Sequence, residues 1–167
     1  RLPFAIKIAA SLRKEFPNLS LQIAGDGPLY QELRNATKEL SWIEFLGRVS
    51  LEEMSSVYRN ADILLHTAIF ETFGLAIVEA LCHGVPVVCA NLDPMRGLVR
   101  NQVTGALCSP FELNDWISSI SDILSAPQTL ENMKLAAVAN NSDFLSAEQS
   151  SQAIYQLLVD VAKRESI

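Results

Sequence analysis

Two glutamates and a glycine stand close together in the stretch IFETFGLAIVEALCHGVPVV, residues 69–88. Glu71 and Glu79 are the carboxylates of an otherwise apolar segment, and carboxylates avoid full burial unless another group pairs with them. The pattern predicts a helix over about 74–83, with Gly74 at its start. The first amides of a helix lack intrahelical partners and lie at the positive end of its dipole, so this start is a candidate anion site.

The spacing of the two carboxylates suggests what they face. Glu71 precedes the helix, and Glu79 lies about five residues inside it, roughly 7–8 Å along the axis at about 1.5 Å per residue. Both cannot bind the anion, because like charges repel. They suit hydroxyl-rich groups on either side of a diphosphate, which is the layout of a nucleotide sugar. On spacing alone, the alternative is that both side chains are simply solvated.

The elements that must position these residues follow from apolar runs and turn signals. Strands are predicted over 19–25, 42–47, 62–68, 85–90 and 104–109. Helices are predicted over 4–16, 28–40, 50–61 (with a capping box from Ser50 to Glu53), 74–83, 112–125, 128–140 and 146–164. The strands are apolar runs, typical of a parallel sheet buried on both faces. We therefore predict an α/β fold, a Rossmann-like doubly wound parallel sheet closed by carboxyl-terminal helices.

Length and charge limit the function classes. The 167 residues suffice for one domain, and a net charge of −6 disfavours a nucleic-acid module, which needs a basic face. The sequence shows no membrane span or signal peptide. The histidines and cysteines have no metal-ligand spacing, so neither a metal nor another cofactor is predicted. In a parallel sheet, ligands bind at the carboxyl ends of strands, which selects the loops 25–28, 47–50 and 68–74.

The motifs in these loops resemble those of retaining glycosyltransferases of the GT-B fold, family 4. The resemblance rests on ETFGLAIVEALCHGVPVV, LQIAGDGP, IEFLGRVSLEEMSSVYRNADILLHTA and NQVTGALCSP, which together span most of the chain. It implies that residues 1–167 are the nucleotide-sugar-binding, carboxyl-terminal half of such an enzyme, without its first strand and its amino-terminal acceptor domain. The substrate would be a nucleoside diphosphate sugar, and the acceptor a hydroxyl of a glycan or of a lipid-linked molecule.

The resemblance also implies a role for each matching residue. Glu71 would face the hydroxyls of the donor sugar as the catalytic residue, and Glu79 would hold the ribose hydroxyls. Amides around Phe73, Gly74, Leu75 and Ala76 would receive the diphosphate. The turn of Gly47, Arg48 and Val49 would line the nucleobase pocket, and Gly25 and Gly27 would keep the neighbouring turn open.

The sequence departs from the family pattern in one place and leaves rival functions open. The family's G-G-x-P-E is replaced by LDPMRGLV over 92–99, in which Arg96 is a candidate phosphate or sugar contact. One rival is a GT-B-fold epimerase or hydrolase of nucleotide sugars, and another is a non-catalytic module that keeps the fold. The resemblance implies a cytoplasmic protein that reaches the inner face of the membrane, if at all, through the missing domain. We expect the isolated chain to be inactive.

Overall fold

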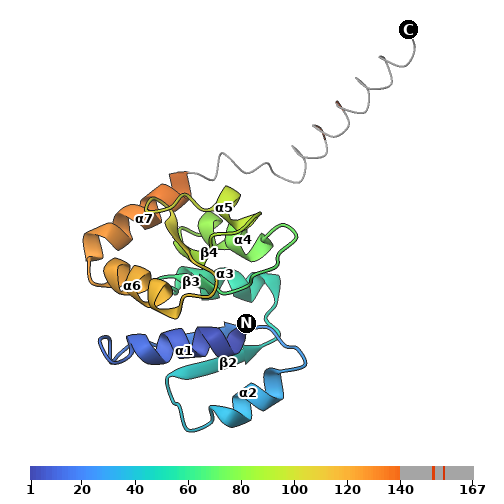
Figure 1. The fold of residues 1–167 in the computed structure, drawn as a ribbon. Helices are drawn as coiled ribbons and strands as arrows, with labels where there is room; N and C mark the ends of the chain where they lie inside the picture. The colour runs from blue at the N-terminus through green and yellow to red at the C-terminus, as the bar shows by residue number, and fades with distance from the viewer. Residues whose placement is uncertain (140–151, 153–155, 157–167) are drawn as a thin grey trace.

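Strands and helices alternate along the computed structural model, which describes residues 1–139 together with Gln152 and Gln156 (Figure 1). The strands are β1 (Leu21–Ala24), β2 (Ile43–Gly47), β3 (Leu64–His66), β4 (Val87–Ala90) and β5 (Gly105–Cys108). The helices are α1 (Leu2–Leu12), α2 (Tyr30–Ala36), α3 (Leu51–Arg59), α4 (Leu75–Cys82), α5 (Met95–Leu98), α6 (Leu113–Leu124) and α7 (Pro127–Ala139). The helix predicted over 146–164 lies outside the described residues.

All strand pairs are parallel, as predicted, but they form two sheets instead of one. β1 pairs with β2, and β3, β4 and β5 pair in that order. Figure 1 shows α1, β2 and α2 in the lower part of the view, and the other sheet with α4 to α7 above them. The α/β class is therefore confirmed, and the expected sheet is interrupted between β1 and β3.

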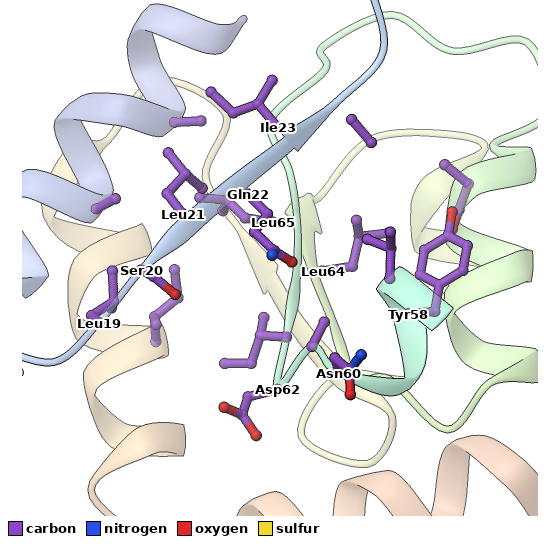
Figure 2. A pocket seen from close by; sticks show the side chains of 18 of the residues that line it. Leu19, Ser20, Leu21, Gln22, Ile23, Tyr58, Asn60, Asp62, Leu64 and Leu65 are labelled. Atoms are coloured by element: carbon purple, nitrogen blue, oxygen red, sulfur yellow. The ribbon is translucent and has the colours of Figure 1, made fainter. Parts of the chain in front are cut away.

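An apolar slot occupies that interruption. A cavity of about 860 Å³ lies between the two sheets, with Leu21 and Ile23 of β1 on one side and Leu64 and Leu65 of β3 on the other (Figure 2). We refer to this cavity as the interstrand slot. Both of its walls are edges of parallel strands, which are the partners that the additional strand implied by the family resemblance would need.

The core is built around β4, whose four residues are all buried. Trp116 of α6 is fully buried, and its indole nitrogen donates a hydrogen bond of 2.8 Å to the Ser109 carbonyl. Gly105 of β5 lies so close to β4 that a Cβ at this position would be 1.9 Å from the main-chain oxygen of Val87. The burial of β4 on both faces explains why its sequence is a continuous apolar run.

Sequence signals predicted the start of α3 correctly and the start of α2 incorrectly. The capping box at the start of α3 is present: the Ser50 hydroxyl accepts from the Glu53 amide at 3.3 Å, and Glu53 accepts from the Ser50 amide at 3.0 Å. Pro28, predicted at a first helical position, lies before α2, which begins at Tyr30. The short helix α5 was not predicted. Among the described residues, no helix combines the length and apolarity that crossing a membrane requires.

Candidate functional site

The loop between β3 and α4 carries the glycine that starts the candidate anion site. Gly74 is the residue before the first turn of α4, and its φ of +89° is a conformation that side chains other than glycine rarely adopt. A Cβ there would lie 3.0 Å from a methyl of Leu98 in α5. α4 has no side-chain cap, so its first amides remain available to a ligand.

Glu71 lies in that loop, beside the last residue of β3. One oxygen of Glu71 accepts from the Thr72 amide at 3.0 Å, and the other lies 3.5 Å from Nε2 of His66. Nε2 of His66 is buried and makes no hydrogen bond within the described residues. Burial lowers the pKa of His66, and the negative charge of Glu71 opposes that shift. The imidazole of His66 is therefore neutral near neutral pH.

Glu79 lies on the second turn of α4, and α3 supplies its partner. The Tyr58 hydroxyl donates to Oε2 of Glu79 at 3.0 Å and also approaches the Ala76 carbonyl at 3.4 Å. Burial and the carboxylate of Glu79 raise the pKa of Tyr58 far above its usual value, so the phenol stays protonated and remains a donor.

His83, just after α4, completes this contact. Its ring stacks on that of Tyr58, with centroids 5.3 Å apart and an interplanar angle of 29°. Its Nδ1 lies 2.7 Å from the main-chain oxygen of Glu79, and its Nε2 lies 3.2 Å from the Ser55 hydroxyl. A carbonyl oxygen can only accept, so Nδ1 carries the proton and, in the neutral ring, Nε2 accepts from Ser55.

The two glycine turns predicted to form the nucleobase side lie next to each other. The Gly25 amide donates to the Gly47 carbonyl at 2.7 Å, and both glycines have positive φ, +112° and +67°. The side chain of Arg48 is 86% exposed, and its Nε lies 3.8 Å from Oδ2 of Asp26. Arg48 is thus free to move toward a ligand, since an exposed pair of this kind holds it only weakly.

The interstrand slot gathers part of the predicted site at one end. Its lining includes Gly25, Arg48, Val49, Ala76 and Glu79, which come from both sheets. The remaining predicted residues do not line it: they are Gly27, Gly47, Glu71, Phe73, Gly74 and Leu75. Most of the slot is apolar and lies between strand edges, and Arg48 and Glu79 are charged side chains among the predicted site residues that line it.

Two further observations differ from the sequence-based expectations. Arg96, a candidate ligand contact, makes two hydrogen bonds of 2.7 Å to Asp93 and is therefore already paired. Tyr58, His66 and His83 were not predicted to join the site. Tyr58 falls within a matching motif, and His66 ends a strand at the site edge, but only the folded arrangement brings these rings to the two glutamates.

Comparisons with known proteins show the family to which the chain belongs. Residues 1–139 match the family model of glycosyl transferases group 1. A D-inositol 3-phosphate glycosyltransferase of Mycobacterium sp. (strain KMS) is 39% identical over 103 residues, which cover 61% of this chain and 23% of that protein. The chain therefore spans about a quarter of the length of this curated relative.

Solved structures show the same fold. The Anabaena protein HepE in complex with UDP-glucose has a TM-score of 0.78 and 25% identity, and the match covers 92% of this chain and 44% of that one. A mutant of the S. aureus protein TarM, solved in complex with Fondaparinux, alpha-GlcNAc-glycerol and UDP, has a TM-score of 0.85 and 17% identity, covering 94% and 32%.

Proposed function

Because the chain belongs to the glycosyl transferases group 1 family, we propose that it is the donor-binding half of an enzyme that transfers a hexosyl group. The donor is a nucleoside diphosphate sugar, and the acceptor is a hydroxyl, in the synthesis of a glycan or a glycolipid. The transfer proceeds with retention. The acceptor site belongs to a second domain of the complete enzyme.

The observation that carries this proposal is the placement of two carboxylates around an uncapped helix start. Glu71 lies just before Gly74, and Glu79 lies on the following turn with one oxygen held by Tyr58. The amides of Leu75 and Ala76 suit the diphosphate, because they lie at the positive end of α4. The glutamates then suit the hydroxyls of the sugar and of the ribose, because these neutral groups can donate hydrogen bonds to a carboxylate.

The chemistry required of this half is electrostatic. As the bond from the sugar to the diphosphate breaks, negative charge grows on the leaving phosphate, and preorganised amides stabilise that charge. Glu71 lies where it can accept hydrogen bonds from the sugar. We further propose that the leaving phosphate assists the incoming hydroxyl, as the family resemblance implies. Residues 1–167 alone then bind only part of the transition state, so we expect no turnover from them.

A thermal-shift panel tests the proposal in the complete enzyme. UDP-, GDP- and ADP-sugars are compared, with UDP-glucose first because the similar HepE structure contains it. We expect at least one nucleotide sugar to raise the unfolding temperature of the wild type. Glu79→Gln removes the negative charge without changing the size of the side chain, and should reduce that rise.

The matched control is Glu131→Gln, the same change at an exposed position of α7. This variant should respond to the donor like the wild type. An equal response in Glu79→Gln and the wild type, or no response to any nucleotide sugar, would contradict the proposed function.

A further inference from the structure

We infer that Tyr58 is a positioning residue for donor binding, which holds the Glu79 carboxylate in one orientation while the His83 ring braces it. This inference rests on the proposed function, because it assigns Glu79 to the donor. Tyr58 itself does not touch the donor in this arrangement. It acts through the one oxygen of Glu79 that it occupies.

The contact between the two residues is short and sheltered. Tyr58 is 5% exposed, and its hydroxyl lies 3.0 Å from Oε2 of Glu79. Hydrogen bonds to an ionised carboxylate are stronger than those between neutral groups, and burial protects this one from competing water. Oε2 is thereby fixed, while the structure gives Oε1 no hydrogen-bond partner among the described residues. Oε1 is the atom that remains for a ligand hydroxyl.

The ring of His83 contacts the main chain of Glu79. Nδ1 of His83 donates to the Glu79 carbonyl at 2.7 Å, while the face of the ring packs on Tyr58. Ser55, one turn before Tyr58 in α3, orients the other nitrogen of this ring at 3.2 Å. Both ends of Glu79 are therefore tied to α3: its carboxylate through Tyr58, and its carbonyl through His83 and Ser55.

This arrangement matters for binding because a glutamate side chain is otherwise free to rotate. A solvated glutamate on a helix surface samples several rotamers, and ordering it on binding costs free energy. Because Tyr58 already orders the Glu79 side chain in the folded protein, donor binding does not have to order it. Tyr58→Phe keeps the ring, its packing and its stacking on His83, and removes only the hydroxyl. We expect it to weaken donor binding about 10-fold, in line with the loss of one charge-assisted hydrogen bond.

The test is a double-mutant cycle on donor affinity in the complete enzyme, measured by calorimetry with the nucleotide sugar that gives the largest thermal shift. Tyr58→Phe should weaken binding in the wild-type background. In the Glu79→Gln background the same change should have a smaller effect, because the carboxylate that Tyr58 orients has been replaced by a neutral amide. Ser55→Ala should weaken binding less than Tyr58→Phe, and Ser118→Ala, a hydroxyl lost from α6, should leave it unchanged.

Steady-state kinetics separate positioning from a general loss of structure. A positioning role predicts a raised KM for the donor with kcat nearly unchanged. A merely structural role would lower kcat through the loss of folded enzyme and leave KM unaffected. Circular dichroism and the unfolding temperature of Tyr58→Phe show which fraction of the variant is folded.

Each result has one meaning. If the wild type binds a nucleotide sugar, Glu79→Gln binds it more weakly, and Tyr58→Phe binds like the wild type, the inference is wrong and the proposed function stands. Equal losses from Tyr58→Phe in both backgrounds would also overturn the inference, since Tyr58 would then act independently of Glu79. If the wild type binds no nucleotide sugar, the proposed function fails and the inference fails with it.

Discussion

Nε2 of His66 lies 3.5 Å from Oε2 of Glu71, too far for a good hydrogen bond and close enough for charge to be felt. The histidine is the last residue of β3, and the glutamate lies in the loop that leads to α4. A titrating ring therefore stands beside the carboxylate that we assign to the donor sugar. Its protonation state affects both the stability of the fold and the charge at the site.

His66 should make the fold less stable in mild acid. Its pKa is lowered in the folded protein because burial disfavours the charged ring. As the pH falls below about 6.5, the unfolded chain takes up the proton first, so the free energy of unfolding decreases. His66→Gln cannot titrate, and chemical denaturation at about pH 7 and at about pH 5.5, on either side of the ordinary histidine pKa, should show a smaller decrease for this variant. Equal decreases in both proteins would contradict the prediction.

Removing the charge of Glu71 should lower the pKa of His66 further. Glu71 opposes the effect of burial on the pKa of His66, so Glu71→Gln should lower that pKa below its wild-type value. NMR titration can follow the ring directly, because the chain contains two histidines. Glu52→Gln, at an exposed position on α3, should leave the His66 titration unchanged. An unchanged pKa of His66 in Glu71→Gln would show that the two side chains do not interact in solution.

Gly74 should tolerate no side chain. Gly74→Ala places a Cβ at positive φ and within 3.0 Å of Leu98, so it should lower the free energy of unfolding by about 1–2 kcal/mol. Chemical denaturation measures the change. Gly97→Ala is the matched control, since a Cβ there meets nothing within 4 Å. It should cost little, or stabilise by about 0.5 kcal/mol through the unfolded chain. Similar losses from both substitutions would argue against the left-handed conformation of Gly74.

The interstrand slot makes a prediction about backbone amides. The amides of Leu21 and Leu64 bond to Trp42 and Pro86 of neighbouring segments, so those of Gln22 and Leu65 point to the opposite edges, into the slot. We expect a further strand to fill the slot in the complete enzyme, as the family resemblance implies, so these two amides should exchange with solvent slowly there. In residues 1–167 alone they should exchange much faster. Equal exchange in the two proteins, measured by NMR or mass spectrometry, would rule out an inserted strand.

Local signals in the sequence predicted the parts of the site that lie on one segment. Glu71, Gly74 and Glu79 fall within nine residues, so helical rise and the conformational freedom of glycine suffice to place them. The capping box of α3 is equally local and is confirmed. The assignment of β4 succeeded because burial on both faces leaves a continuous apolar run, whereas β1 and β2 are only partly buried.

Contacts between distant segments could not be predicted in this way. Tyr58 and Glu79 are 21 residues apart, and no spacing rule says which face of α3 meets α4. Arg48 lies close to Asp26 of another turn, and Arg96 forms an ion pair with Asp93. α5 was missed because four residues show no helical period, although Met95 anchors it in the core.

The division of the strands into two sheets has a mechanical consequence for the donor. Gly25 follows β1 and Gly47 ends β2 in one sheet, while Glu79 lies on α4, which follows β3 of the other sheet, and the interstrand slot lies between the two sheets. A donor that contacted both groups, as we propose, would link the two sheets. Part of its binding free energy would then be spent on aligning them.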